Sequence, residues 1–178
     1  YGKPACADAA FNLSHTVDAV ILSIWEGEDT AQIMIGCDVE QIKTYRPGVA
    51  RRFFTKEEYR SLEAVSDPRE QAEWFCRYWT KKESVMKMTG LGLSLPMDLY
   101  DIRQAKAVTD CEKTQAWYEK ECKKGQMKAE LARAAHILLH ETMYFKEYGY
   151  EKCRIAVCST SDQFAWNYVL AKPCMLGI

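Results

Sequence analysis

Two runs of apolar and β-branched residues lie near the start of the chain. Residues 19–25 read AVILSIW, residues 31–40 read AQIMIGCDVE, and the polar stretch EGEDT lies between them. Two such runs joined by a short polar turn predict a β-hairpin. Two later apolar runs, residues 152–159 (KCRIAVCS) and 164–171 (FAWNYVLA), predict further strands.

Helical periodicity predominates between these strands. Residues 48–65 predict one helix. A second helix is expected from Asp67, which can act as its N-cap, with Pro68 at the first helical position and Glu70 at the spacing of a capping box. That helix is expected to stop at Gly90, because glycine commonly ends helices.

The second half of the chain mixes both kinds of pattern. Residues 93–108 predict loop and strand, and residues 112–147 predict mainly helix with a break at Gly125. The sequence contains no evident internal repeat or low-complexity tract. Because helices and strands are intermixed along the chain, the sequence predicts an α+β fold.

Two acidic residues interrupt the apolar run at residues 31–40. Asp38 and Glu40 are two positions apart, so in a strand their carboxylates point to the same face. Like charges this close repel unless a cation lies between them or one takes up a proton. The alternative is a solvated pair at a sheet edge.

A third carboxylate lies on the apolar face of the helix that begins at Asp67. The expected solvated stripe of this helix contains Glu73, Arg77, Thr80, Lys81 and Ser84. Glu83 falls outside that stripe, with Lys87 one turn later near the edge of the same face. A carboxylate there is costly unless it is paired or binds a metal. The alternative is a surface ion pair between Glu83 and Lys87.

Overall composition narrows the class of protein. A formal net charge of −1 argues against a nucleic-acid binder that relies on a broad basic surface. The longest apolar runs are shorter than the ~18 residues that span a bilayer, so no membrane association is expected. The eight cysteines form no CxxC pair, which favours free thiols in a cytoplasmic protein over a zinc site or a disulfide framework.

Histidines are few. His136 and His140 are four residues apart in a helical pattern, where they could bind a metal or belong to a half-buried helix face. His15, in FNLSH, could be a structural histidine or a phosphate ligand.

The acidic and basic positions together favour one chemistry. Carboxylate oxygens from Asp38, Glu40 and Glu83 suit Mg²⁺. The basic side chains of His15, Lys82 and Lys87 suit the oxygens of a phosphorylated substrate. This pattern indicates a Mg²⁺-dependent phosphoryl-type enzyme.

Five motifs in order then resemble a known family, the 4′-phosphopantetheinyl transferase superfamily, in its surfactin-synthetase type. The resemblance runs over most of residues 1–100, and the D-x-E motif followed by W-x-x-K-E-S-x-x-K is its most specific part. The matching stretches are YGKP (1–4), FNLSH (11–15), IGCDVE (35–40), RRFFTKEEY (51–59) and WTKKESVMKMTGLGLSLP (79–96).

The resemblance implies an activity and a metal. Phosphopantetheine would pass from coenzyme A to a serine of an acyl or peptidyl carrier protein, with release of 3′,5′-ADP. It implies that Asp38, Glu40 and Glu83 hold Mg²⁺, and that Glu83, or a water it orients, is the general base. Glu58 matches an acid associated with the active site of this family.

The resemblance also implies coenzyme A contacts. Lys87, His15 and Lys82 would contact phosphates, and Lys87 and His15 would belong to the catalytic machinery. Trp79 would support the helix that carries Glu83. The positions that match those at the nucleotide end of coenzyme A are Gly2, Lys3, Pro4 and Ser14.

Members of this type consist of two similar α+β halves, with coenzyme A in the cleft between them. Residues 1–32 resemble the tail of the first half and a linker, and residues 33–178 resemble the second half. Most of the first half is therefore expected to be absent. Residues 111–150 are expected to form a helical extension, in which Lys123 and Lys124 could contact an acidic carrier protein.

Two other functions are compatible with parts of the pattern. A non-catalytic remnant or binding module would keep the motifs without a complete cleft. A Mg²⁺-dependent nuclease or phosphatase would use the carboxylates, but it would not explain FNLSH or W-x-x-K-E-S-x-x-K.

Overall fold

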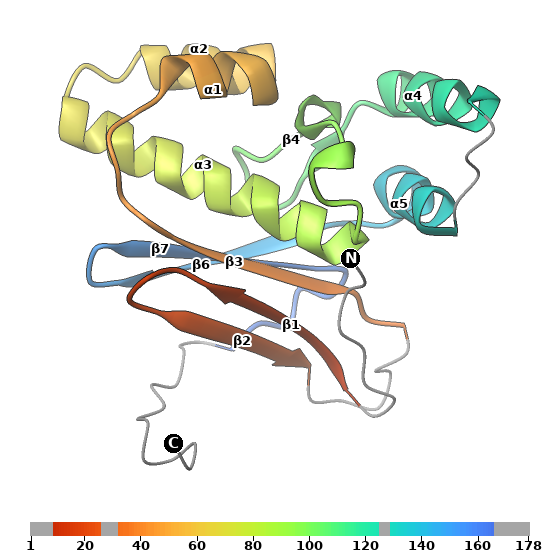
Figure 1. The fold of residues 1–178 in the computed structure, drawn as a ribbon, viewed down its shortest axis with the longest axis horizontal. Coiled ribbons are helices and arrows are strands. Elements are labelled where there is room, and N and C mark those ends of the chain that lie inside the picture. Colours follow the sequence, from red (N-terminus) through yellow and green to blue (C-terminus); the bar gives the residue numbers. More distant parts are fainter. Residues whose placement is uncertain (1–8, 26–31, 125–128, 166–178) are drawn as a thin grey trace.

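A three-stranded antiparallel sheet forms the centre of the protein, which the computed structural model describes over residues 9–25, 32–124 and 129–165 (Figure 1). Its strand order is β3-β7-β6. The long helix α3 crosses one face of this sheet, and α1 and α2 lie beyond α3. The three strands are β3 (Ile35–Gln41), β7 (Cys153–Ser159) and β6 (Tyr144–Tyr150).

Shorter elements surround this centre. The other strands are the antiparallel pair β1 (Ala10–His15) and β2 (Val20–Trp25) and the short pair β4 (Tyr100–Asp101) and β5 (Val108–Thr109). The helices are α1 (Pro47–Phe53), α2 (Lys56–Glu63), α3 (Pro68–Thr89), α4 (Cys111–Lys123) and α5 (Ala129–His140), with 3-10 turns η1 (Gly92–Ser94) and η2 (Met97–Leu99).

The predicted hairpin between residues 19–25 and 31–40 is wrong. Strand β2 pairs instead with β1, where Leu13 lies opposite Leu22. Strand β3 pairs with β7, more than a hundred residues later, where Asp38 lies opposite Ala156. The reason is a tighter turn upstream, in which Thr16 N–H donates to the carbonyl of Ala19 (2.8 Å).

Strand β1 lies along the edge of β3 that faces away from β7. Side chains of β1 accept hydrogen bonds from the backbone of β3. The N–H groups of Cys37 and Val39 donate to Asn12 Oδ1 (2.9 Å) and Ser14 Oγ (3.3 Å). The polar face of β1 is therefore the buried one. The opposite face of the β1–β2 pair is apolar and at least half exposed, at Leu13, Val20, Leu22 and Ile24.

Helix α3 begins and ends as its caps predict. The Asp67 side chain accepts hydrogen bonds from the N–H groups of Arg69 and Glu70, and Pro68 occupies the first turn. Gly90 ends the helix in the left-handed region, with φ of 82°, a conformation that residues with a Cβ rarely adopt. The helix predicted from Asp67 to Gly90 is confirmed.

The single helix predicted over residues 48–65 is wrong. The chain forms α1 and α2 instead, because Phe54 is extended and Thr55 starts a new helix. Thr55 and Glu58 form a reciprocal capping box at that start.

The solvated stripe predicted for α3 is also wrong, because most of that side faces the sheet. Thr80, Lys81 and Ser84 are buried. Arg77 forms a bidentate pair with Glu147 of β6 (2.8 and 3.1 Å), and Lys81 lies 3.0 Å from the same carboxylate. Charged side chains of a helix can face a sheet when the strands carry oppositely charged partners. The sequence pattern of the helix alone does not reveal such partners.

Gly36 allows α3 and β3 to approach very closely. A Cβ at this position would lie 1.9 Å from the backbone carbonyl oxygen of Ser84, so any side chain would force the two elements apart. The absence of a side chain at Gly36 therefore fixes the spacing between β3 and α3 beside Asp38, two residues further along β3.

The region of residues 112–147 is helical only in part. Helices α4 and α5 confirm the helical pattern up to residue 140, but β6 occupies Tyr144–Tyr150, so the helical extension predicted for 111–150 is wrong there. The expected break at Gly125 lies outside the described residues. Tyr148 and its neighbours on β6 instead pair with β7, which confirms the strand predicted at residues 152–159.

The strand predicted at residues 164–171 lies almost entirely outside the described residues. Of its positions, Phe164 and Ala165 are described, and neither belongs to a strand.

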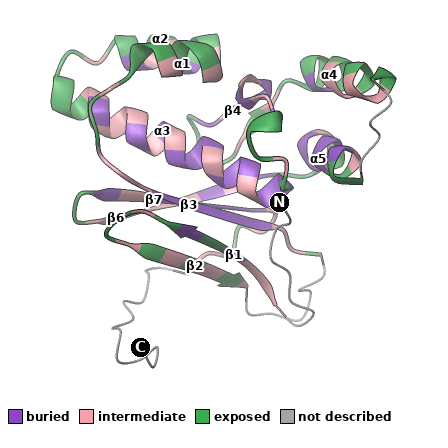
Figure 2. Ribbon diagram, in the orientation of Figure 1, coloured by how far each residue is buried: buried purple, intermediate pink, exposed green. Residues whose placement is uncertain are grey.

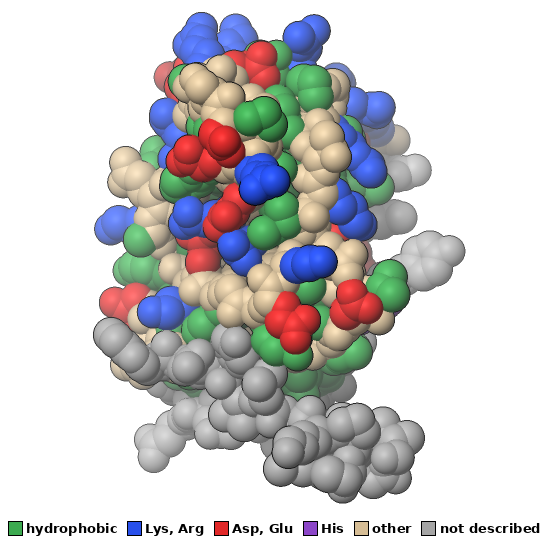
Figure 3. All heavy atoms as spheres, turned by 90° about the vertical axis from the view of Figure 1, so that its left-hand side faces the viewer, with side chains coloured by type: hydrophobic (Ala, Val, Ile, Leu, Met, Phe, Trp, Pro, Cys, Tyr) green, Lys and Arg blue, Asp and Glu red, His purple; other side chains and the backbone are tan. Residues whose placement is uncertain are grey.

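Burial and charge complete the description of the fold. The buried positions concentrate on α3, α5 and the central sheet (Figure 2). On the face seen in Figure 3, acidic and basic side chains are interspersed among apolar ones. The free thiols within the described residues include Cys76, Cys111, Cys122, Cys153 and Cys158. Within those same residues, no helix has the length and apolar character needed to cross a membrane.

Candidate functional site

The candidate site lies where β3 faces the second half of α3. Asp38 is buried, and its Oδ1 atom lies 2.6 Å from Lys87 Nζ. Ser14 Oγ donates to the same oxygen (2.9 Å) and accepts from Lys87 Nζ (2.6 Å). Strands β1 and β3 and helix α3 therefore meet at one carboxylate.

The other carboxylate oxygen of this group is unsatisfied. Asp38 Oδ2 is buried and has no hydrogen-bond partner among the residues that the structure describes. Buried carboxylate oxygens are normally paired, because an unpaired one loses its hydration without compensation. Asp38 thus has one neutralised oxygen and one that is open to a further positive or donating group.

Two more carboxylates lie close enough to respond to this charge. Burial, and then repulsion from Asp38, raises the pKa of Glu83 to about 7, although Lys87 opposes the shift. Burial and Asp38 also raise the pKa of Glu40. The shifts of Glu40 and Glu83 indicate that both acids share the electrostatic environment of Asp38, in which Lys87 is the cation that pairs with Asp38 and acts on Glu83.

These acids have the donor chemistry that Mg²⁺ prefers, since all three supply carboxylate oxygens. Asp38 Oδ2 is the atom that most needs a cation. Among the described residues, no three or more His, Cys, Asp or Glu side chains are arranged as a preformed metal cluster. The residues therefore fit Mg²⁺ in charge and donor type, and their side chains would have to turn toward it.

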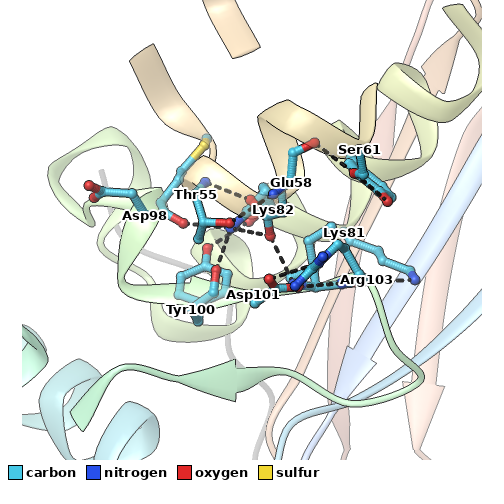
Figure 4. Close-up of polar contacts among 12 residues, drawn as sticks. Thr55, Glu58, Ser61, Lys81, Lys82, Asp98, Tyr100, Asp101 and Arg103 are labelled. Carbon is cyan, nitrogen blue, oxygen red and sulfur yellow. Dashed lines mark hydrogen bonds and ion pairs between the residues drawn. The ribbon is translucent and has the colours of Figure 1, made fainter. Parts of the chain in front are cut away.

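The expectation that Lys82 contacts a phosphate is wrong for this structure. Lys82 is fully buried and points toward Glu58 of α2 and Tyr100 (Figure 4). Its ammonium pairs with Glu58 Oε1 (2.9 Å) and donates to the carbonyls of Met97 (2.7 Å) and Tyr100 (2.5 Å). These contacts lie within the protein core.

Glu58 is the centre of this internal network. Its carboxylate, also fully buried, accepts hydrogen bonds from the N–H groups of Thr55 and Ile102 (both 2.8 Å) in addition to the Lys82 pair. The network joins α2, α3 and the segment after β4. It holds the helix that carries Glu83 in place, which is a positioning function.

The structure places the other predicted site residues in different environments. His15 is exposed, and strand alternation directs it to the face of β1 opposite Ser14, so the structure does not bring it to Asp38. Trp79 stacks on Phe75 with ring centroids 6.2 Å apart, within the aromatic packing of α3. Gly2, Lys3 and Pro4 lie outside the described residues.

Asn12 is a site-forming residue that the sequence analysis missed. Its side chain accepts a hydrogen bond from Cys37 N–H of β3, and it lies two residues before Ser14, which contacts Asp38. The signal that could have found it is the alternation of FNLSH, in which Asn12 and Ser14 share a strand face.

Comparison with known proteins identifies the class that this fold and site define. The family model of the 4′-phosphopantetheinyl transferase superfamily matches residues 34–137, more than half of the chain. The chain belongs to this superfamily, which confirms the predicted family and the α+β fold.

Individual relatives support the same assignment. The chain is similar to the 4′-phosphopantetheinyl transferase Sfp of Bacillus subtilis (strain 168), with 42% identity over 106 residues, covering 58% of this chain and 44% of that protein. It is 38% identical over 95 residues to the 4′-phosphopantetheinyl transferase AcpT of Escherichia coli (strain K12), covering 50% and 45%. It is 30% identical over 113 residues to the L-aminoadipate-semialdehyde dehydrogenase-phosphopantetheinyl transferase of Mus musculus, covering 54% and 34%. The chain thus spans less than half the length of these relatives.

Proposed function

We propose that this chain carries the metal-binding part of a Mg²⁺-dependent 4′-phosphopantetheinyl transferase. The enzyme would transfer phosphopantetheine from coenzyme A to a serine of an acyl or peptidyl carrier protein and release 3′,5′-ADP. The main supporting observation is the group formed by Asp38, Glu83 and Lys87, in which a buried oxygen of Asp38 has no hydrogen-bond partner within the described part of the chain. The family assignment supports the same activity.

Asp38, Glu40 and Glu83 would hold the metal. When bound, Mg²⁺ would polarise the pyrophosphate and offset the charge that develops on the leaving oxygen. A cation at Asp38 would also offset the repulsion that, in addition to the larger effect of burial, raises the pKa values of Glu40 and Glu83.

Glu83 would act as general base. Its pKa of about 7 applies to the chain without metal; burial, the largest cause of that raised value, would still favour uptake of the serine proton once Mg²⁺ offsets the neighbouring negative charges. The carrier serine hydroxyl loses its proton to Glu83, its oxygen bonds to the β-phosphorus of coenzyme A, and the phosphoanhydride bond to 3′,5′-ADP breaks. A water oriented by Glu83 could relay the same proton.

Lys87 would serve the phosphates. Its ammonium now neutralises Asp38, and it is about a third exposed, so it can turn toward an incoming phosphate oxygen. Ser14 would then keep Asp38 oriented through the bond that it already donates. In this proposal His15, Gly2, Lys3 and Pro4 remain coenzyme A contacts, His15 only after a local rearrangement, and the core lysine Lys82 does not.

The proposed partners follow from the reaction. They are coenzyme A and an acyl or peptidyl carrier protein, encountered in the cytoplasm without a membrane or nucleic acid.

A transfer assay tests this function directly. The chain is incubated with coenzyme A, Mg²⁺ and a panel of apo carrier proteins, and mass spectrometry follows the phosphopantetheine increment on the carrier. Asp38→Ala and Glu83→Ala should abolish transfer, while Glu70→Gln, an exposed acid on the same helix, should retain it.

Binding measurements make the test decisive for the chain alone. Calorimetry should detect Mg²⁺ binding that Asp38→Ala removes. Transfer that survives in both alanine variants, or a folded chain that binds neither Mg²⁺ nor coenzyme A, would refute the proposal. Because the chain spans less than half the length of its relatives, binding without transfer would point to the non-catalytic binding module only if a longer chain is inactive as well.

A further inference from the structure

The end of helix α5 carries two histidines that the proposed transferase does not use. His136 and His140 are one helical turn apart, and their ring centroids lie 5.0 Å from each other. Both side chains are exposed. The buried side of α5 is formed by other residues, namely Leu131, Ala134, Ala135, Ile137 and Leu138. A half-buried histidine face, one of the two sequence interpretations, is therefore excluded.

We propose that His136 and His140 form a binding site for a borderline transition-metal ion such as Zn²⁺ or Ni²⁺. Histidines at positions i and i+4 present their imidazoles on one helix face, where both can bind the same ion. Imidazole nitrogen suits Zn²⁺, Cu²⁺ and Ni²⁺, whereas Mg²⁺ prefers oxygen. This site is therefore chemically distinct from the carboxylate site at Asp38.

A carboxylate is available to complete the coordination. Glu141 follows α5 directly, and its Oε1 atom lies 3.7 Å from His136 Nε2. Because the described residues contain no preformed cluster of three such donors, the histidine pair would make the first two bonds. Glu141, which is exposed at the helix end, would then rotate toward the ion, with waters in the remaining positions.

Further donors lie across a groove between α5 and α4. His140 lines this groove together with Cys111, Glu112 and Glu119 of α4. The two acids of this groove add negative charge to the surroundings of His140, which favours a divalent cation. Arg133, the exposed basic residue one turn before His136, partly opposes this effect.

Nickel titration of the untagged full chain tests the site by NMR. The chain contains three histidines, so the imidazole C–H resonances are few and assignable by substitution. Substoichiometric Ni²⁺, which is paramagnetic, should broaden the His136 and His140 resonances and leave those of His15 sharp. An excess of Mg²⁺ should not restore the broadened signals.

Matched variants give the second readout. His136→Ala and His140→Ala should each weaken Ni²⁺ binding about tenfold or more, since one imidazole loses the effective concentration that the other provides. His15→Ala is the control and should bind as the wild type does. Ni²⁺ should also raise the Tm of the wild type but not that of the double histidine variant.

Three results would overturn the site. The first is broadening of His15 before the helix pair, which would indicate tighter binding near β1. The others are unchanged affinity in both single variants, or no broadening at micromolar Ni²⁺. Both histidines are exposed, so circular dichroism should show that their alanine variants remain folded. None of these outcomes depends on transferase activity.

Discussion

Removing the Lys82 ammonium should destabilise the fold rather than weaken ligand binding. In Lys82→Met the side chain keeps nearly its length, but the buried carboxylate of Glu58 loses the partner at 2.9 Å. Glu58 would retain its two backbone donors, the N–H groups of Thr55 and Ile102. Two carbonyls that now accept from Lys82, those of Met97 and Tyr100, would lose a donor.

The magnitude follows from burial. Both side chains of the pair are fully buried, so water cannot replace the lost partner. Breaking one side of a buried ion pair costs about 3–5 kcal/mol of unfolding free energy, whereas an exposed pair contributes at most about 1 kcal/mol. The exposed pair of Lys113 and Asp98 provides the matched control, with Lys113→Met expected to cost no more than about 1 kcal/mol.

Urea unfolding followed by circular dichroism measures both variants. The double variant Glu58→Gln/Lys82→Met should recover a substantial part of the loss, because it leaves no unpaired buried charge. A loss below about 1 kcal/mol in Lys82→Met would refute the assignment of Lys82 to the core. So would weakened coenzyme A binding with unchanged stability, since that is the behaviour of an accessible phosphate contact.

Three further predictions concern the interface between β3, β6 and α3. The pKa of Glu83 is about 7, above its ordinary 4.5, so the native state keeps a proton that the unfolded chain releases between these values, and stability should fall as pH rises through that window. Glu83→Gln should remove this fall, and after allowance for partial exposure it should be about 1–2 kcal/mol more stable than the wild type at pH 8, as measured by urea unfolding. An identical pH profile in the variant would contradict the raised pKa of Glu83. Gly36→Ala should lower the stability by about 1–3 kcal/mol and lower the Tm, because its Cβ would meet the carbonyl oxygen of Ser84. An unchanged Tm would show that β3 and α3 approach less closely at this position. Burial alone would raise the pKa of Glu147, but Arg77 and Lys81 hold it below its ordinary value. Glu147→Gln should therefore lower the free energy of unfolding by about 2 kcal/mol at pH 7, and by progressively less as pH falls below about 4. A loss of stability that does not depend on pH would exclude the ion pairs as its cause.

Features determined by neighbouring residues were predictable from the sequence. The extent of α3 follows from Asp67, Pro68 and Gly90, which act within a turn of their own positions. The shared face of Asp38 and Glu40 follows from strand geometry alone. Both predictions depend only on local backbone geometry.

Features determined by distant partners were not predictable in this way. The partner of β3 is β7, and no local signal indicates a pairing across that sequence separation. The polar side of α3 faces the sheet because Glu147 and Arg154 on the strands supply partners for Arg77 and Glu73. An amphipathic pattern identifies a polar face, but it does not distinguish solvent from a charged neighbour.

The candidate site shows the same division. The motifs predicted Asp38, Glu83 and Lys87, which the structure brings to one electrostatic environment, while their roles remain proposals. Lys82 is adjacent to Glu83 in sequence, yet it points into the core because helical periodicity separates successive side chains by about 100°.

The close approach at Gly36 limits how this site could be altered by mutation or design. The clash involves the main chain of Ser84, so no substitution at position 84 would relieve it. Widening the site for a bulkier ligand would therefore require α3 to slide or rotate along β3, because repacking of side chains cannot increase that separation. In a randomised library that targets the site, position 36 should tolerate glycine alone, and sequence diversity would be better placed on the exposed ends of the two elements.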